Sequence, residues 1–452
     1  MLNEKLAAWK SGLMGKEICV VGIGISHLPL IDYLVKHGAK VTACDKKTRE
    51  QLGETATKLE SAGVRLQLGS SYLSSLSGDM IFKSPGLRPD LPEFVEARKK
   101  GICVTSEMEV FLDLCPAHVT AITGSDGKTT TTTLVHKLLT MAGFTTHVGG
   151  NIGKPLLPEI DRIGESDRVV LELSSFQLMT MKKSPQTAVV TNITPNHLDY
   201  HTDYQEYIDA KLNILSHQNS RNLAVLNLDN PVTAECVEKA RGEVLTFSRK
   251  QKADVWLDGN VIKIFDEAVL DIRDIKIPGM HNVENYMAAI AAVHAVVGKD
   301  VISACAREFG GVPHRIELVR ELEGVRYYNS SIDSSPNRTM NTLRVFSEPV
   351  VLIAGGKDKG IPYDDLGPAI KEHVRTLVLI GKTAEIIGKV AKQAAPDVPV
   401  FYEDSYEAAV LRAKEQAKSG DVVLLSSAST SFDMFKNFEE RGNLFKELVN
   451  RL

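Results

Sequence analysis

The stretch TGSDGKTTTT, at residues 123–132, constrains the fold most, because it joins an apolar run to a helical pattern. It departs from the strict P-loop pattern, since Ile122 stands where that pattern has its first glycine. Its two glycines still let backbone N–H groups point at a phosphate, Lys128 can reach the β- and γ-oxygens, and the Thr129 hydroxyl suits Mg²⁺. The alternative is a glycine-rich turn before a threonine-rich helix, although threonine is a poor helix former. The stretch therefore predicts an ATP site.

Short β-rich runs alternate with helical patterns along nearly the whole chain of 452 residues. This alternation predicts an α/β protein whose sheets are mostly parallel and carry flanking helices. Three domains are expected, at residues 1–106, 107–312 and 313–452, the first and last Rossmann-like and the central one P-loop ATPase-like. Residues 255–279 alternate apolar and polar side chains around an Asp-Gly turn, which predicts a small antiparallel sheet in the central domain.

The composition excludes several classes of protein. Lys and Arg number 53 against 57 Asp and Glu, a net charge of −4, so neither nucleic acid nor a membrane surface is an expected partner. The six cysteines form no CxxC pair and are expected to be free thiols in a reducing compartment. The N-terminal residues lack the apolar core of a signal peptide, so we expect a cytoplasmic protein. Nothing suggests a large exposed apolar face, which favours a monomer.

A second nucleotide-binding signal lies near the N-terminus, at residues 20–45. A buried strand runs into glycines, a helix follows, and a second strand ends at Asp45. His27 stands where a dinucleotide-binding fingerprint has its third glycine, which argues against an NAD(P)-dependent oxidoreductase. The backbone from Gly22 to Ser26 can still meet a diphosphate at a helix N-terminus.

Two further residues, Glu172 and His197, suggest metal and substrate chemistry. Glu172 ends a buried strand, where its charge requires a partner. His197 lies just past another strand end, where open α/β sheets bind ligands, but Asp199 and His201 are so close that spacing does not decide which residue is a ligand. Lys211 lies on a helical pattern, and periodicity alone favours an ordinary solvated lysine there.

These stretches together resemble the Mur ligase family, which builds the peptide of peptidoglycan from UDP-linked precursors. The resemblance covers essentially the whole chain, in order, and rests on the phosphate loop together with GGNIG at 149–153, LELSSFQL at 171–178, NHLDYH at 196–201, Lys211, HNVEN at 281–285, PHRIE at 313–317 and GNLFKEL at 442–448. Within the family, LELSSFQL and residues 426–445 look most like the members that add D-glutamate to UDP-N-acetylmuramoyl-L-alanine.

The resemblance implies a role for each matching residue. Residues implied to bind ATP are Gly124, Ser125, Asp126, Gly127, Lys128, Thr129, Thr130, Asn282, Asn285 and Arg315. Residues implied to bind the UDP-linked substrate are Gly24, Ile25, Ser26, Asp45, Ser84, Pro85, Gly86, Asn151 and Ser174. Residues implied to bind D-glutamate are Ser334, Lys359, Ser431 and Phe438. The implied Mg²⁺ ligands are Thr129, Glu172, His197 and Lys211 as a carbamate, and the last three form the catalytic set with Lys128.

One stretch departs from the family pattern. The family usually has an Asp-Ser pair after the first strand of the third domain, and that Asp contacts the ATP ribose. Here Ser330 takes the Asp position and Asp333 follows three residues later, so either Asp333 substitutes or the nucleotide contact is weaker. The alternatives left open are a sister ligase for another amino acid, a folate polyglutamate ligase and, in another class, a non-catalytic nucleotide-binding regulator.

Overall fold

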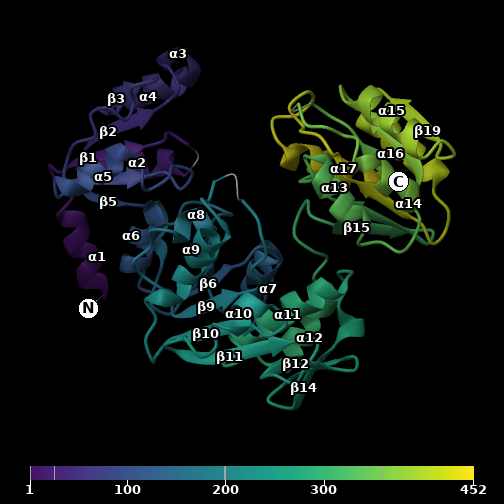
Figure 1. The fold of residues 1–452 in the computed structure, drawn as a ribbon, viewed down its shortest axis with the longest axis horizontal. Helices are drawn as coiled ribbons and strands as arrows, with labels where there is room; N and C mark the ends of the chain where they lie inside the picture. The colour runs from purple at the N-terminus through teal and green to yellow at the C-terminus, as the bar shows by residue number, and fades with distance from the viewer. Residues whose placement is uncertain (1, 25, 198–199, 359) are drawn as a thin grey trace. The chain divides into compact units, whose positions relative to one another are not determined.

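The computed structural model describes residues 2–24, 26–197, 200–358 and 360–452 (Figure 1). The chain divides into two compact units. The first unit contains residues 1–272 and 283–305, and the second contains residues 273–282 and 306–452. The predicted α/β class is confirmed, because three separate sheets form and all three consist mainly of parallel strands. The predicted boundaries of three domains stay a prediction.

The N-terminal sheet has five parallel strands in the order β3-β2-β1-β4-β5. They are β1 (Glu17–Val21), β2 (Lys40–Asp45), β3 (Arg65–Leu68), β4 (Met80–Lys83) and β5 (Cys103–Thr105). The helices of this part are α1 (Leu2–Ser11), α2 (His27–Lys36), α3 (Arg49–Leu52), α4 (Glu54–Ser61) and α5 (Pro92–Lys99). The strand order reverses between β1 and β4, so their carboxyl ends form the crevice in which such sheets bind ligands.

The central sheet has nine strands in the order β14-β13-β12-β11-β10-β9-β6-β8-β7. They are β6 (His118–Thr123), β7 (Thr146–Gly150), β8 (Arg168–Glu172), β9 (Thr187–Val190), β10 (Leu223–Asn227), β11 (Glu243–Ser248), β12 (Val255–Asp258), β13 (Val261–Ile264) and β14 (Glu267–Asp271). Only the β12–β13 and β13–β14 pairings are antiparallel. The predicted antiparallel strands therefore exist, but β12 pairs in parallel with β11 and so extends the main sheet.

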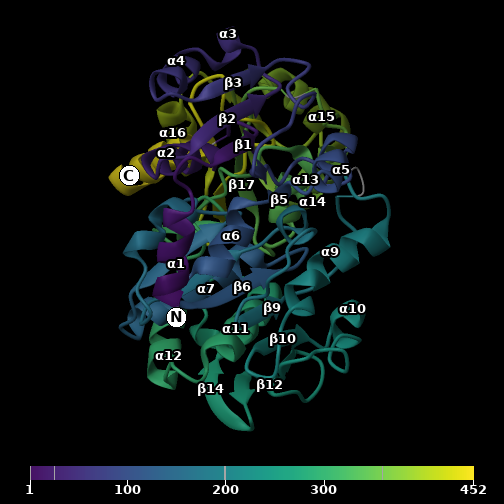
Figure 2. The same cartoon turned by 90° about the vertical axis from the view of Figure 1, so that its left-hand side faces the viewer.

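Helices surround the central sheet and carry several candidate residues. They are α6 (Glu107–Leu114), α7 (Lys128–Met141), α8 (Ser175–Leu178), α9 (Tyr204–Ser216), α10 (Pro231–Ala234), α11 (Met280–Val293) and α12 (Lys299–Glu308), with 3₁₀ segments η1 (Leu157–Arg162) and η2 (Ile272–Asp274). One hydrophobic core runs from the N-terminal sheet into the central sheet. It is continuous because α1 packs on α6 (Figure 2) and α2 packs on η1.

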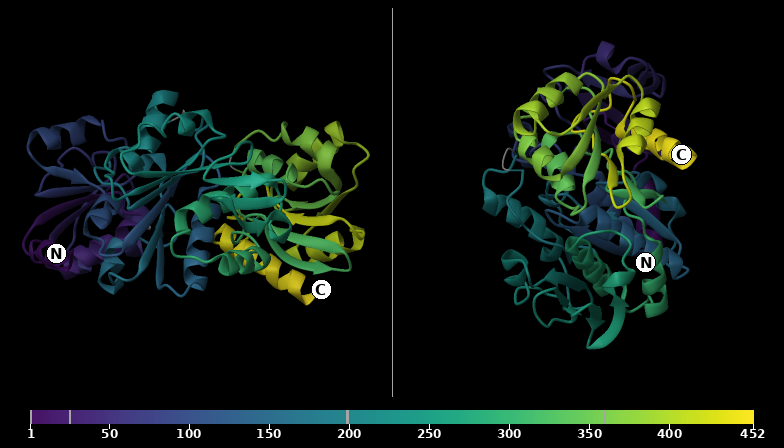
Figure 3. Two further views of the ribbon diagram at one scale, coloured as in Figure 1. Left: turned by 90° about the horizontal axis from the view of Figure 1, so that it is seen from below. Right: turned by 90° about the vertical axis from the view of Figure 1, so that its right-hand side faces the viewer.

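The second unit is built on a six-stranded sheet in the order β15-β16-β20-β17-β18-β19. Its strands are β15 (Glu317–Leu322), β16 (Val325–Asn329), β17 (Val350–Ala354), β18 (Val374–Ile380), β19 (Val400–Glu403) and β20 (Val422–Leu425). Only β15 is antiparallel to its neighbour. The helices α13 (Pro336–Leu343), α14 (Leu366–His373) and α15 (Ala384–Ala394) pack on one face, and α16 (Tyr406–Gln416) and α17 (Phe438–Arg451) pack on the other (Figure 3). Among the described residues, no helix is long and apolar enough to cross a membrane.

Candidate active site

The phosphate loop connects the end of β6 to the start of α7, and both of its glycines are required by close contacts. Gly124 has φ +150, and a Cβ atom there would lie 1.9 Å from the Thr191 hydroxyl oxygen. Gly127 has φ +78, and a Cβ atom there would lie 2.3 Å from the Asn285 amide oxygen. A side chain at either position would displace its neighbour, so the loop backbone stays uncovered at the helix N-terminus, where an anion is favoured.

The loop is held in place by the segment that follows β9. The buried Ser125 donates its backbone N–H to the Asn192 carbonyl at 2.8 Å and its hydroxyl to the Thr194 carbonyl at 2.9 Å. Lys128 curls back and donates to the Ser125 carbonyl at 2.9 Å. Asp126 is exposed, and Thr129 and Thr130 are half-buried at the start of α7. Of the implied ATP residues, Ser125 therefore has an anchoring role within the protein.

Lys211 lies on α9 and is buried, so the interpretation as a solvated lysine is wrong. Its side chain is 2 % exposed, its Nζ donates to the Gly124 carbonyl at 2.6 Å, and it lies 4.7 Å from the centre of the Tyr207 ring. Burial first, and then the nearby charge of Lys128, lower the pKa of the Lys211 amine to about 7. Near neutral pH a large share of this amine is therefore uncharged and nucleophilic.

Glu172, at the end of β8, is also buried, with 1 % of its surface exposed. Its Oε1 accepts a hydrogen bond from the Asn151 amide at 2.7 Å. Its Oε2 is buried and has no hydrogen-bond partner within the described part of the chain. A buried carboxylate oxygen without a donor is costly, so it fits a bound cation. No three His, Cys, Asp or Glu side chains of the described residues gather into a metal cluster, so such a cation would need hydroxyl or carbamate ligands as well.

The two histidines after β9 have different surroundings. His197 is exposed, has φ +54, and its ring centre lies 5.1 Å from that of Phe176. His201 is buried, its Nε2 is 3.0 Å from the Ser175 hydroxyl, and its ring stacks on Phe176 at 5.7 Å. Both rings therefore pack on Phe176, and His197 as the ligand stays a prediction. Asp199 lies outside the described residues.

A cavity of about 370 Å³ joins the N-terminal and central parts of the first unit. Its walls include five of the residues implied to bind the UDP-linked substrate, namely Ser26, Pro85, Gly86, Asn151 and Ser174. Gly24, Asp45 and Ser84 do not line it, and Ile25 lies outside the described residues. The cavity also contacts Glu107, which the sequence did not single out, and burial raises the pKa of that carboxyl to about 7.

The N-terminal loop after β1 is fixed by the residue that breaks the dinucleotide fingerprint. His27 is 2 % exposed, and its Nδ1 lies 2.8 Å from the Gly22 carbonyl oxygen. Burial lowers the pKa of His27, so the neutral ring donates Nδ1–H to that oxygen. Asp45 accepts the backbone N–H of Ile23 at 2.7 Å and that of Lys47 at 2.9 Å. Both side chains hold the loop in shape.

The remaining implied ATP residues lie on α11 and at residue 315. Asn282 and Asn285 are three positions apart on α11, so they share a helix face. The Asn285 amide oxygen accepts the Thr131 hydroxyl at 3.2 Å, which ties α11 to the start of α7. Arg315 is flanked by two residues with left-handed backbone, His314 at φ +64 and Ile316 at φ +46.

The implied D-glutamate residues belong to the second unit. Ser431 is buried, Ser334 is half-buried, and Phe438 opens α17, where its carbonyl accepts the Ser331 hydroxyl at 2.8 Å. Lys359 lies outside the described residues. The sequence did not single out Arg441, although it is completely buried and donates to the Ser331 hydroxyl at 2.9 Å and to the Ser331 carbonyl at 2.7 Å.

The departure from the family pattern is accommodated inside the second unit. Asp333 is buried, and its Oδ2 accepts hydroxyls from Thr342 at 2.7 Å and Ser426 at 2.8 Å. Ser330 is also buried, and its hydroxyl oxygen accepts the Ile316 N–H at 3.2 Å. These bonds give Asp333 and Ser330 roles in internal packing.

Family models match residues 16–106 as "Mur ligase MurD-like, N-terminal domain", residues 122–293 as "Mur ligase middle domain" and residues 314–429 as "Mur ligase, glutamate ligase domain". The chain belongs to the Mur ligase family. Among its curated relatives in this family, the UDP-N-acetylmuramoylalanine–D-glutamate ligases of Ruminiclostridium cellulolyticum and Acetivibrio thermocellus are 53% and 51% identical, each with 100% of both chains covered.

Solved structures of Mur ligases share the fold. UDP-N-acetylmuramate-alanine ligase MurC from Thermotoga maritima has a TM-score of 0.57 at 20% identity, covering 96% of this chain and 99% of that one. MurF ligase from Thermotoga maritima, in complex with ADP, has a TM-score of 0.56 at 19% identity, covering 97% of this chain and 96% of that one. The predicted Mur ligase fold is therefore confirmed over nearly the whole chain.

Proposed function

We propose that this protein joins D-glutamate to the L-alanine of UDP-N-acetylmuramoyl-L-alanine in peptidoglycan precursor synthesis and releases ADP and phosphate. The observation that carries the proposal is the pair of buried groups at the phosphate loop, the Lys211 amine on the Gly124 carbonyl and the partnerless oxygen of Glu172. The choice of D-glutamate rests on the relatives whose names specify that reaction.

The proposed reaction follows from the weakness of a carboxylate as an acyl donor. ATP transfers its γ-phosphoryl group to the L-alanyl carboxylate, which forms an acyl phosphate and ADP. The D-glutamate amine then attacks the acyl carbon and loses a proton, and the tetrahedral intermediate expels phosphate to leave the amide. In such transfers the protein mainly positions groups and neutralises charge.

We assign the ATP phosphates to the loop from Gly124 to Thr130, with Lys128 as the countercharge. Thr129, Glu172, His197 and Lys211 would hold Mg²⁺, which when bound neutralises phosphate charge. The uncharged Lys211 amine can add to CO₂, forming an N–C bond and losing a proton. The resulting carbamate would be an anionic oxygen ligand, and the burial that lowers the pKa of this lysine favours the uncharged amine that the addition requires.

We assign the UDP-linked substrate to the crevice after β1 and β4 and to the 370 Å³ cavity with Asn151 and Ser174 on its wall. We assign D-glutamate to the second unit, at Ser334, Lys359, Ser431 and Phe438. We also propose that the protein acts as a monomer, which sedimentation equilibrium would check.

The direct test is ADP release with UDP-N-acetylmuramoyl-L-alanine and one amino acid at a time. D-Glutamate should support turnover, while L-alanine, L-lysine and meso-diaminopimelate should not. Turnover with L-lysine and none with D-glutamate would identify a sister ligase. Nucleotide binding without substrate-dependent ADP release would identify a non-catalytic regulator.

A further inference from the structure

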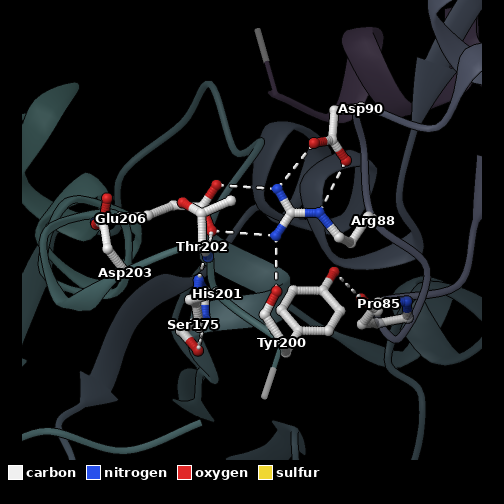
Figure 4. Close-up of polar contacts among 9 residues, drawn as sticks. All are labelled: Pro85, Arg88, Asp90, Ser175, Tyr200, His201, Thr202, Asp203 and Glu206. Atoms are coloured by element: carbon white, nitrogen blue, oxygen red, sulfur yellow. Dashed lines mark hydrogen bonds and ion pairs between the residues drawn. The ribbon is translucent and has the colours of Figure 1, made fainter. Parts of the chain in front are cut away.

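Arg88, in the loop after β4, makes five hydrogen bonds with its guanidinium (Figure 4). Nε and Nη2 donate to the two oxygens of Asp90 at 2.9 and 2.8 Å. Nη1 and Nη2 donate to the two oxygens of Glu206 at 3.1 and 3.0 Å. Nη1 also donates to the Tyr200 carbonyl at 2.7 Å. A guanidinium has five N–H donors, so this arrangement uses all of them.

The partners of Arg88 on the central side shape the turn that follows His197. Glu206 lies in the first turn of α9, and its Oε2 accepts the Thr202 N–H at 2.8 Å. The same oxygen lies 3.3 Å from Nδ1 of His201. The bonds from Arg88 lower the pKa of Glu206 to about 2, so this carboxylate stays charged at any working pH. Arg88 and Glu206 therefore fix the path of the chain from 200 to 206.

The same cluster reaches two other parts of the proposed site. The Tyr200 hydroxyl donates to the Pro85 carbonyl at 3.4 Å, and its ring lies 4.4 Å from that of Phe176. His201 contacts the Ser175 hydroxyl, next to the substrate-facing Ser174. Three segments thus meet here, namely residues 84–88 of the N-terminal part, the turn at 174–177, and residues 200–206 (Figure 4).

An ordinary surface ion pair contributes little to stability, and three observations set Arg88 apart from that class. Its pair with Glu206 is doubly bonded, and both side chains are 23% exposed. It also binds a backbone carbonyl, so it constrains the chain path as well as a side chain. The contact with Glu206 joins residues 118 positions apart, and it links the N-terminal and central parts of the same unit.

Arg49 provides a matched contrast. It also makes a doubly bonded pair, at 3.2 and 2.6 Å to Glu60, but within the N-terminal part alone. Those side chains are 57% and 41% exposed. The two arginines thus share chemistry and differ in burial and in what they connect.

We propose that Arg88 is a positioning residue that holds the substrate loop at Ser84–Gly86 in register with the segment from Tyr200 to Glu206, which begins three positions after His197. The inference rests on the proposed function and adds to it a residue that need not contact substrate. Without Arg88, the site for the UDP-linked substrate and the cation site would each remain, but the position of one site relative to the other would be less strictly fixed. ATP and D-glutamate sites lie on other segments and should be affected less.

The experiment compares Arg88→Ala, Arg88→Lys, Glu206→Gln and the control Arg49→Ala in the full chain. In ADP-release assays, Arg88→Ala should raise KM for UDP-N-acetylmuramoyl-L-alanine and the Mg²⁺ concentration for half-activation by about tenfold, as expected for losing a charge-assisted, doubly bonded contact. KM for ATP and D-glutamate should change less than about twofold, within ordinary mutational variation. Arg88→Lys should recover part of the loss, because lysine keeps the charge but not the fork.

Two measurements are independent of turnover. Calorimetric binding of UDP-N-acetylmuramoyl-L-alanine without ATP or Mg²⁺ should weaken in Arg88→Ala and not in Arg49→Ala. Backbone amides of residues 200–206 should exchange hydrogen faster in Arg88→Ala and in Glu206→Gln. The double variant Arg88→Ala with Glu206→Gln should lose little more substrate affinity than either single variant, because the two side chains act through one contact.

The inference is overturned if a folded Arg88→Ala matches Arg49→Ala in substrate KM, Mg²⁺ dependence and exchange of residues 200–206. It is also overturned if Arg88→Ala raises KM for all three substrates equally, which would indicate general destabilisation. If the wild type releases no ADP with D-glutamate, the proposed function fails, whereas the exchange comparison still decides whether Arg88 orders this turn.

Discussion

At the scale of single residues, the most informative side chain is Lys211, because it is buried, whereas most lysines are exposed to solvent and charged. We expect Lys211→Ala to lower kcat by at least about a hundredfold, since it removes a proposed ligand of the cation on the transferring phosphate. Short carboxylic acids such as formate should restore part of the activity by filling the space of the carbamate. ADP-release assays with and without formate would show this, and Lys299→Ala, a solvent-exposed lysine, should keep full activity. Full activity in Lys211→Ala would rule out the carbamate role.

The lowered pKa of Lys211 also predicts how stability depends on pH. In the unfolded chain a lysine has its ordinary pKa of about 10.4, whereas in the folded protein Lys211 has a pKa of about 7. Between these values the unfolded state binds more protons, so this lysine makes the free energy of unfolding rise with pH. The free energy of unfolding of the wild type, relative to that of Lys211→Met, should rise by at most about 1.4 kcal/mol per pH unit from about pH 7 to about pH 9. Urea unfolding of both proteins in CO₂-free buffer would measure the difference, and a constant difference would contradict the prediction.

At the scale of elements, the start of α7 requires a glycine for steric reasons as well as for backbone conformation. Gly127→Ala should abolish ATP binding and destabilise the fold by about 1–3 kcal/mol, since its Cβ would meet Asn285 at a positive φ. Gly143→Ala, just after α7, is the matched control, because φ is +92 there and no atom lies within 4 Å of the added Cβ. Calorimetric ATP binding should fail only for Gly127→Ala. Equal ATP affinity in the two variants would show that the close contact with Asn285 is unimportant.

The elements themselves were largely predictable, whereas several contacts between them were not. Strands and helices follow from local periodicity, and β12–β14 were expected as antiparallel strands. That β12 extends the main sheet depends on pairing with β11, which periodicity does not contain. Lys211 lies on a helix whose pattern looks ordinary, and only its contact with Gly124, 87 residues away, reveals its burial. The sequence shows that His27 departs from the dinucleotide fingerprint, but the hydrogen bond of its ring to the Gly22 carbonyl depends on the folded structure.

At the scale of the whole molecule, the arrangement of cores predicts how the protein unfolds. One core runs through the N-terminal and central sheets, while the second unit has its own cores on the two faces of its sheet. Since residues in one continuous core unfold together, calorimetry should show two transitions, although the chain has three sheets.

Two core substitutions would test this assignment, because each lies in only one unit. Ile160→Ala, on η1 at the junction with α2, should lower the free energy of unfolding of the first unit by about 2–5 kcal/mol and leave that of the second unit unchanged. Ile387→Ala, on α15, should do the reverse. Hydrogen exchange would identify the sheets in each transition. If Ile160→Ala loosens the central sheet but leaves the N-terminal sheet at its original melting temperature, the shared core does not couple them, and the N-terminal part unfolds alone.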